Sequence, residues 1–202
     1  MTTLLAIDTA GPRLQLALRH DGAIDTLVED MPTGQAERIF PALGELLKQN
    51  RLTYADLARG AVTTGPGSFT GVRIGLSAAR GLGLALGIPA LGIPSLLAIS
   101  LSGPAGAPVA VLIDARRDEA YFQRFSGPGH SADRPALLPV EQARSRVPPD
   151  VTLIETPVPD IARVAAFAAS ADPAAWPPEA AYVREADAKP QGRFRIPRVE
   201  PA

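Results

Sequence analysis

The residues best suited to chemistry lie in one glycine-rich segment, Thr63 to Arg73, which reads TTGPGSFTGVR. Such a loop binds phosphate when bare backbone amides can approach the ligand. A Walker loop requires G-x-x-x-x-G-K-[ST], but counted from Gly65 the second glycine position holds Thr70, and no lysine follows. The dinucleotide pattern G-x-G-x-x-G fails because its third glycine comes one residue late, at Gly71. The loop therefore fits neither phosphate-binding template.

Two hydroxyl side chains of this loop, Ser68 and Thr70, lie at an expected strand-to-helix turn, where a hydrolase nucleophile can sit. The sequence around Ser68 is not G-x-S-x-G, and the two histidines, His20 and His130, have no obvious route to it. The chain has no cysteine, which excludes thiolate nucleophiles and cysteine-ligated metals. We therefore expect Ser68 or Thr70 to be the N-cap of the next helix, with no catalytic residue and no metal site.

Two aspartates, Asp8 and Asp114, each close an apolar strand and precede a turn. Together they could coordinate Mg²⁺ beside a nucleotide, or each could accept backbone amides of its own turn. Pro12, in the first turn, lacks an amide proton, and the ARRD sequence after Ile113 has no glycine. Because the backbone cradle for phosphate is missing, we favour the turn role. No cofactor is expected, and a vestigial ATP site is the weaker alternative.

The helix expected over residues 70–87 carries a small residue at every fourth position. Each interior glycine costs about 1 kcal/mol relative to alanine, so close packing must offset this cost. Apolar and small positions cover roughly two thirds of the circumference, whereas an ordinary surface helix needs an apolar stripe about 100° wide. We therefore favour contact with another subunit over a second contact within the chain. On this interpretation Gly75→Leu or Ala79→Leu abolishes dimerisation but leaves the monomer folded. The row consists of Gly71, Gly75, Ala79, Gly83 and Gly87.

Alternating hydrophobic and turn patterns indicate an α/β protein with two related halves. Strands are expected at 4–8, 13–18 and 23–29, helices at 34–50 and 70–87, strands at 59–64 and 88–93, and a helix with Ser95 as N-cap. After a proline- and glycine-rich hinge, strands are expected at 109–114, 120–125 and 151–154, and a helix at 161–171. The predicted division is a first lobe at 1–101, a hinge at 102–108, a reduced second lobe at 109–188 and a basic, disordered tail at 189–202. This tail could also contact RNA phosphate.

The composition of the chain limits the classes of protein to which it can belong. A net charge of −1 over 202 residues gives no general nucleic-acid signal. No segment approaches the roughly 20 apolar residues of a membrane span, and the first residues lack the pattern of a signal peptide. We therefore expect a cytoplasmic protein with no membrane contact.

Four sequence motifs together resemble the TsaB (YeaZ) family. They are LAIDT ending at Thr9, GPGSFTGVRIG starting at Gly65, DAR starting at Asp114 with EAY ending at Tyr121, and AYVR ending at Arg184. The resemblance implies an actin-like, Hsp70-like (ASKHA) ATPase fold with two lobes and a reduced C-terminal lobe. The motif residues it carries over are Asp8, Thr9, Gly65, Pro66, Gly67, Ser68, Phe69, Thr70, Gly71, Arg73, Asp114, Arg116 and Tyr121.

The resemblance also implies a function. Members of this family are non-catalytic partners of TsaD, and act with the ATPase TsaE in threonylcarbamoyl transfer to N6 of the adenosine next to the anticodon, in tRNAs that read codons beginning with A. TsaD carries the metal-binding histidines, and tRNA contact by this chain is indirect or weak. The first two helices form a helical bundle with TsaD, or with a second copy when the chain is alone. This maps the partner interface onto Ile39, Leu43, Leu46, Gly71, Val72, Gly75, Leu76, Ala79 and Gly83.

The sequence departs from the family pattern where the first helix opens and in the second strand. Gln35 and Ala36 replace the usual His-Ser, and Gln15 lies where the first hairpin often has a hydroxyl residue. These changes further weaken the case for a bound nucleotide. The alternatives that stay open are an active ATPase or kinase of the same fold, using Asp8 and Asp114 around Mg-ATP, a metallopeptidase, and a free-standing homodimer.

Overall fold

A computed structural model describes residues 3–181 and 183 of the chain, and its first lobe is built on a five-stranded mixed sheet. The strand order is β3-β2-β1-β4-β5, with β1, β2 and β3 antiparallel and β4 and β5 parallel to β1. Asp21 and Gly22 both have positive φ, 50° and 86°, as the tight turn between β2 and β3 requires. The strands are β1 (Thr3–Asp8), β2 (Arg13–His20), β3 (Ala23–Asp30), β4 (Leu57–Thr63) and β5 (Ala90–Ile93).

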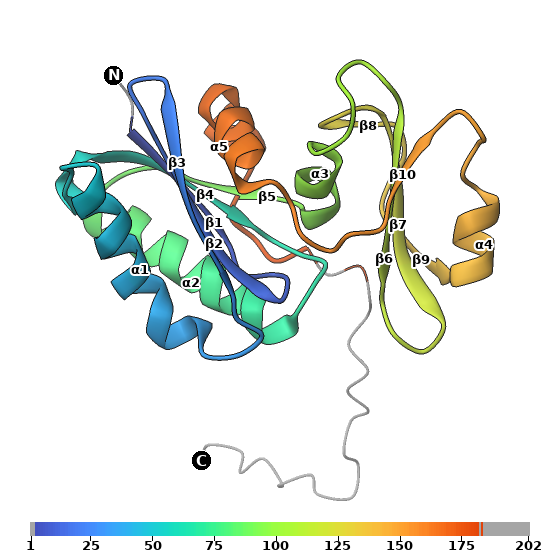
Figure 1. Ribbon diagram of the computed structural model, residues 1–202, viewed down its shortest axis with the longest axis horizontal. Coiled ribbons are helices and arrows are strands. Elements are labelled where there is room, and N and C mark those ends of the chain that lie inside the picture. Colours follow the sequence, from blue (N-terminus) through green and yellow to red (C-terminus); the bar gives the residue numbers. More distant parts are fainter. Residues whose placement is uncertain (1–2, 182, 184–202) are drawn as a thin grey trace, which may run out of the picture.

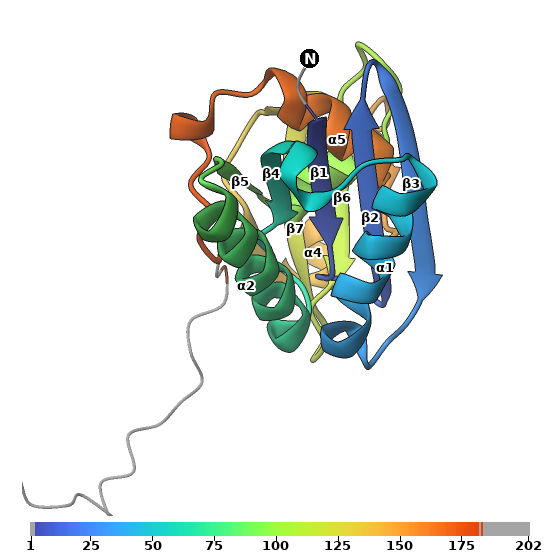
Figure 2. The ribbon, with the colours of Figure 1, turned by 90° about the vertical axis from the view of Figure 1, so that its left-hand side faces the viewer.

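Helices cover both faces of this sheet (Figures 1 and 2). Because successive side chains of a strand point to opposite faces, Leu5 and Ile7 of β1 pack under α1 and α2, whereas Leu4 and Ala6 pack under α3 and α5. Every residue of β1 is buried, as expected for a central strand between two helical layers. The helices of this part are α1 (Gln35–Gln49), α2 (Phe69–Leu86), α3 (Ser95–Ser100) and α5 (Ile161–Ser170), with short 3-10 turns η1 (Tyr54–Asp56) and η2 (Pro173–Ala175).

The second lobe is a smaller sheet (Figure 1). Its order is β10-β6-β7-β8, and β9 also pairs with β7. The helix α4 (Val140–Ser145) packs Ala143 against Leu112 and Phe122 on one face, and the other face joins the core under α3. The strands are β6 (Val109–Asp114), β7 (Glu119–Gly127), β8 (His130–Ser131), β9 (Ala136–Pro139) and β10 (Thr152–Ile154).

The predicted extent of the second lobe, residues 109–188, needs a correction. The helix α5 follows the second sheet in sequence but packs on β1 and β2 of the first. Its Val164 and Ala168 share one hydrophobic core with Leu4 of β1 and Val111 of β6. The chain therefore returns to the first lobe after β10, and the two sheets are joined through a common core. The tail at 189–202 lies outside the described residues. Within the described residues, no helix is long and apolar enough to cross a bilayer.

Candidate functional site

The glycine-rich loop is held from two sides by hydrogen bonds. The amide of Ser68 donates to the Ala10 carbonyl at 2.7 Å, and the amide of Gly65 donates to Ser95 Oγ at 3.0 Å. Ser68 is the N-cap of α2, because its Oγ accepts the amide of Gly71 at 3.2 Å. The expected capping role of Ser68 is confirmed. Ser95, expected to be an N-cap, is instead the first residue of α3 and holds the loop.

The first three members of the small-residue row, Gly71, Gly75 and Ala79, face the first sheet of the same chain, whereas Gly83 is half-buried and Gly87 is exposed. A Cβ on Gly75 would lie 2.6 Å from Thr9 Oγ1 and 3.1 Å from Val62 Cγ2, and a Cβ on Gly71 would collide with the Thr9 carbonyl. Thr9 Oγ1 in turn donates to the Gly71 carbonyl at 2.7 Å. The assignment to another subunit therefore needs a correction at Gly71, Gly75 and Ala79, which are covered within the chain. These two glycines allow α2 to lie close against the end of β1.

The other predicted interface residues occupy the same core. Ile39, Leu43 and Leu46 are 1–2% exposed on the inner side of α1. Val72, Leu76 and Ala79 are 2–6% exposed on the inner side of α2, and a Cβ on Gly83 would lie 3.1 Å from the Ile88 carbonyl. The structure therefore corrects most of the residue list for the partner interface, because these positions are largely covered within the chain; of this list, Ile39 alone also lines the outer surface between α1 and α2.

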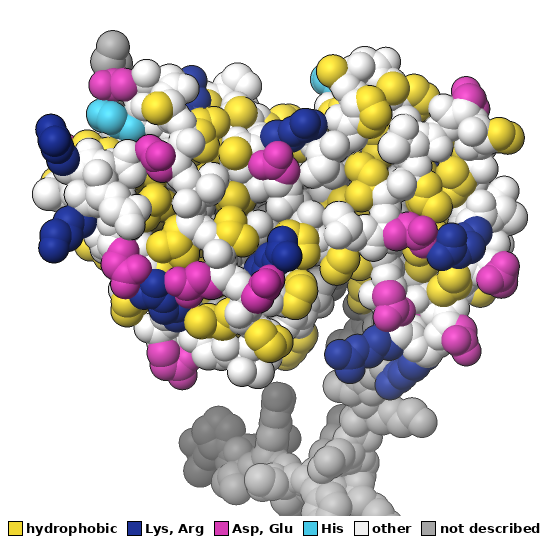
Figure 3. Space-filling view, viewed as in Figure 1, with side chains coloured by type: hydrophobic (Ala, Val, Ile, Leu, Met, Phe, Trp, Pro, Cys, Tyr) yellow, Lys and Arg dark blue, Asp and Glu magenta, His cyan; other side chains and the backbone are white. Residues whose placement is uncertain are grey.

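An exposed groove lies on the outer side of the same two helices, which run side by side over one face of the sheet (Figure 2). It has a volume of about 540 Å³. Phe40 is 45% exposed and Phe69 is 61% exposed, and the Arg73 guanidinium lies 3.3 Å from the centroid of the Phe69 ring. Hydrophobic side chains are visible along the lower part of the first lobe in Figure 3. We call this surface the α1–α2 groove; it is lined by Ala36, Ile39, Phe40, Phe69, Thr70, Arg73, Ile74, Ser77 and Ala78.

Asp8 is fully enclosed at the end of β1 and is 1% exposed. Its Oδ1 accepts hydrogen bonds from Thr63 Oγ1 at 2.5 Å and from the Ala10 amide at 3.1 Å, and its Oδ2 accepts one from Gln15 Nε2 at 2.9 Å. Burial raises the pKa of Asp8 above its usual value, although these hydrogen bonds lower the pKa in the opposite direction. Gln15 also donates to the Pro159 carbonyl at 3.2 Å. Asp8 and Gln15 together thus link β1, β2 and β4 to the segment before α5. Asp8 also accepts a hydrogen bond from the amide of its own turn, as expected.

The loop and the second lobe face each other across an open cleft of about 720 Å³. Gly67, Ser68 and Phe69 line one side; Asp114, Arg116 and Tyr121 line the other. Asp114 Oδ1 accepts the Arg116 amide at 2.7 Å, which confirms its turn role. Asp8 does not line the cleft, so the two aspartates do not converge on one metal position. In the described part of the chain, no three acidic or histidine side chains gather as metal ligands would.

The family motif residues occupy several places. Gly67, Ser68, Phe69, Asp114, Arg116 and Tyr121 line the cleft, and Phe69, Thr70 and Arg73 line the α1–α2 groove. Asp8 and Thr9 are buried, and Thr9 holds α2 against the end of β1 through its hydrogen bond to Gly71. Sequence reasoning did not single out Phe40 and Ile74 of the α1–α2 groove. The signal that could have found the groove is the motif aromatic Phe69, one turn before Arg73 on the polar side of α2.

Comparisons of this chain with known protein families and curated proteins indicate the family to which it belongs. Residues 33–139, just over half of the chain, match the family model described as TsaD, tRNA N6-adenosine threonylcarbamoyltransferase. The Escherichia coli protein TsaB, described as a tRNA threonylcarbamoyladenosine biosynthesis protein, is 32% identical over 151 residues, which cover 71% of this chain and 65% of that protein. Bacillus subtilis TsaB is 36% identical over 59% of this chain and 53% of that protein. The chain therefore spans only about half to two thirds of the length of these curated relatives.

Two solved structures from Pseudomonas aeruginosa have the same fold. One, described as similar to the peptidase YeaZ, aligns with a TM-score of 0.78 at 28% identity, over 91% of this chain and all of the other. The other, YeaZ itself, aligns with a TM-score of 0.73 at 28% identity, over 84% of this chain and 91% of the other. The molecule is thus an α/β protein of the actin-like (ASKHA) class. The chain belongs to the family that the TsaD model describes and, within it, to the TsaB (YeaZ) proteins.

Proposed function

We propose that the chain is a non-catalytic subunit in the threonylcarbamoylation of tRNA, acting by binding and organising a TsaD-type transferase together with TsaE. The modified atom would be N6 of the adenosine next to the anticodon, in tRNAs that read codons beginning with A. Membership of the family supports the pathway, because its E. coli and B. subtilis relatives are described as threonylcarbamoyladenosine biosynthesis proteins. The cytoplasm is the expected location, since tRNA is the final substrate.

The observation that carries the partner role is the α1–α2 groove. Two aromatic side chains, Phe40 and Phe69, are about half exposed beside a concave surface. Exposed apolar patches with concave shape mark interaction sites, and aromatic and arginine side chains are enriched where partners bind. Arg73, which also lines the groove, supplies a charged group beside the apolar centre. The predicted interface on the first two helices is therefore kept, but on their outer side.

The enclosure of Asp8 supports the non-catalytic part of the proposal. The alternative of an active ATPase requires Asp8 to be open to a hydrated Mg²⁺ ion, which binds through carboxylate oxygens. Here Thr63, Gln15 and the Ala10 amide already occupy both oxygens. Opening the site would break hydrogen bonds that are buried in the core, and each buried group left without a partner costs about 1–3 kcal/mol.

Single aromatic substitutions in the groove test the partner role. We expect Phe40→Glu and Phe69→Glu each to weaken binding to TsaD by about 30-fold, because a buried aromatic anchor contributes 2 kcal/mol or more. Formation of the modified nucleoside, in a mixture of TsaD, TsaE and this chain, should fall in parallel. Val28→Glu is the matched control, because Val28 is 46% exposed but lies on β3, outside the groove.

Two results would count against this proposal. Full binding of TsaD by both groove variants would place the interface elsewhere, and undiminished modification without this chain would remove its role in the pathway. Calorimetry with Mg-ATP tests the alternative of an active ATPase. The cleft between the lobes is large enough for a nucleotide. Micromolar binding lost in Asp114→Asn and Arg116→Met would favour that alternative.

A further inference from the structure

A second concave site lies between the lobes, away from the α1–α2 groove and from the open cleft. It is a cavity of about 320 Å³, near the lower end of the range for small-molecule sites. Its walls come from four segments: the start of the glycine-rich loop, the start of α3, the second sheet with the loop after β8, and the segment that follows η2. We call it the Trp176 pocket; it is lined by Gly65, Pro66, Pro94, Leu96, Leu97, Gln123, Ser131, Asp133, Arg134, Pro135, Trp176, Ala181 and Val183.

The wall that carries Trp176 is fixed by backbone hydrogen bonds. The Gly92 amide donates to the Trp176 carbonyl at 2.9 Å, and the Ala181 amide donates to the Thr64 carbonyl at 2.9 Å. The Trp176 ring also packs edge-on against Phe167 of α5, with ring centroids 5.6 Å apart. The segment therefore holds its indole against the first lobe before any ligand arrives, which reduces the entropy cost of binding.

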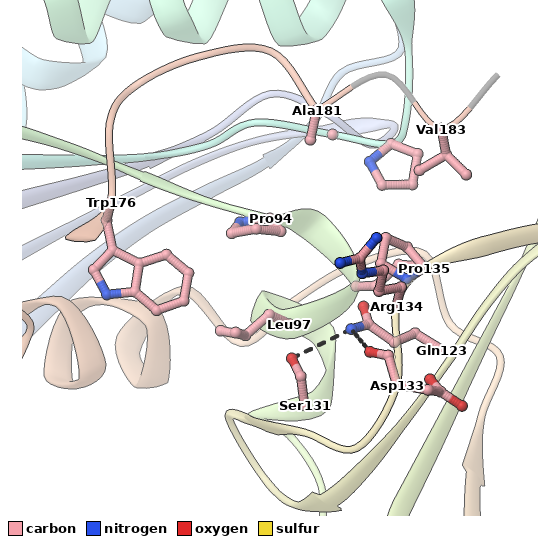
Figure 4. A pocket seen from close by; sticks show the side chains of 13 residues that line it. Pro94, Leu97, Gln123, Ser131, Asp133, Arg134, Pro135, Trp176, Ala181 and Val183 are labelled. Atoms are coloured by element: carbon pink, nitrogen blue, oxygen red, sulfur yellow. Dashed lines mark hydrogen bonds between the residues drawn. The ribbon is translucent and has the colours of Figure 1, made fainter. Parts of the chain in front are cut away.

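The opposite wall presents two polar groups with unused capacity (Figure 4). Gln123 is 5% exposed; its Nε2 donates to Ser131 Oγ at 3.2 Å and to the Asp133 carbonyl at 2.9 Å. Its carboxamide oxygen accepts no hydrogen bond from the described part of the chain. The Asp133 carboxylate accepts hydrogen bonds from the amide and Nε of Arg124. Arg134 forms no ion pair with any described carboxylate.

The groups that line the Trp176 pocket indicate which chemical groups a ligand should carry. Pro94, Leu97 and Trp176 form an apolar wall that suits a flat or compact hydrocarbon body. The Arg134 guanidinium suits a carboxylate, which it can hold through charge-assisted hydrogen bonds. A buried carboxamide oxygen is stabilised by a donor group. We propose that the Trp176 pocket binds a small carboxylate that has an apolar body and one hydroxyl or N–H donor.

The chain offers a direct readout, because Trp176 is its only tryptophan. The probes are 4-hydroxyphenylacetate, its neutral amide, and phenylacetate, which lacks the hydroxyl group. Titration of the full chain with 4-hydroxyphenylacetate should give a saturable change in Trp176 fluorescence, checked by calorimetry. The amide should bind about tenfold more weakly, because a hydrogen bond to a charged group is lost. Phenylacetate should also bind more weakly, because the Gln123 oxygen then stays without a donor.

Two arginine variants complete the test. Arg134→Met keeps the apolar stem but removes the charge, and should weaken binding by about tenfold or more. Arg146→Met is the control, because Arg146 is exposed after α4 and does not line the pocket. Unchanged fluorescence up to about 10 mM of all three probes would overturn the proposal. Equal affinity in Arg134→Met would overturn the carboxylate assignment, provided that both variants unfold at the same urea concentration as the parent chain.

Discussion

Thr9 and Gly75 meet where α2 comes nearest to the first sheet. Thr9 Oγ1 donates a hydrogen bond to the carbonyl of Gly71. A Cβ on Gly75 would lie 2.6 Å from the same Thr9 Oγ1 atom. The hydroxyl thus satisfies a polar group inside the helix–sheet contact, and glycine leaves room for it. This contact explains why glycine is tolerated at Gly71 and Gly75 of α2 despite a cost of about 1 kcal/mol for a glycine inside a helix.

We therefore expect a glycine-to-alanine substitution in α2 to have opposite effects on the free energy of unfolding at Gly75 and at Gly81. Gly75→Ala should lower the free energy of unfolding by about 1–3 kcal/mol, because the added methyl group overpacks a buried contact. Gly81→Ala should raise it by up to about 1 kcal/mol, because helix propensity improves and nothing lies within 4 Å of the new Cβ. Urea unfolding of both variants measures the difference. If the two substitutions shift stability equally, Gly75 is not required for close packing.

The sequence shows the row of small residues on α2, but our interpretation placed another subunit against it where the structure places the first sheet. Periodicity shows that residues share one side of a helix, and it does not show whether a sheet or another molecule lies against that side. Ser68 and Asp114 were predictable because a cap or a turn is a local hydrogen bond. The α1–α2 groove was not, because Phe40 and Phe69 become neighbours only when two helices separated in sequence pack side by side.

At the scale of elements, the long strands and helices could be predicted from the sequence, and three short elements could not. The expected ranges for β1 to β3, α1, α2, β6 and α5 agree with the structure within a few residues. The strands β8 and β9 and the helix α4 have two to six residues each and lie among prolines, so their patterns are too short to recognise. The sequence also predicted α5 as a helix but gave no sign that it packs on the first sheet.

One side chain of β4 holds the returning helix in place. Arg59 Nη1 donates to the carbonyls of Ala168, Ala169 and Ala171, at 2.9, 3.2 and 2.9 Å. These carbonyls lie at the C-terminal end of α5, where backbone acceptors have no partner within the helix and where a positive charge is favourable. Arg59 therefore links the first sheet to the element that closes the shared core.

Loss of this link should loosen α5 before the rest of the fold. Arg59→Met should lower the free energy of unfolding by about 1.5–3 kcal/mol, the usual contribution of a hydrogen bond to a charged group. Because Trp176 packs against Phe167 of α5, its fluorescence should change at a lower urea concentration than the backbone circular dichroism. Arg80→Met, on the exposed side of α2, is the control. Coincident transitions in both variants would show that Arg59 does not anchor α5 separately.

At the scale of the whole molecule, three concave surfaces occupy different parts of one compact frame. The α1–α2 groove lies on the outer side of the first lobe, while the open cleft and the Trp176 pocket both lie between the lobes and share no lining residue. The common core under α3 and α5 joins the two sheets, so the lobes support each other. Because Phe69 lines both the groove and the open cleft, we expect a partner at the groove to reach the edge of the cleft but to leave the Trp176 pocket accessible.

If a second copy and TsaD both bind the α1–α2 groove, the two complexes exclude each other. We expect the chain alone to form a homodimer by light scattering, and added TsaD to convert it into a heterodimer with one copy of each chain. Phe69→Glu should be monomeric alone and should weaken the heterodimer, because the same aromatic anchor serves both contacts. Val28→Glu should behave as the parent chain. A complex with two copies of this chain and one TsaD would show instead that the two partners use different surfaces, because an occupied groove cannot bind a second partner.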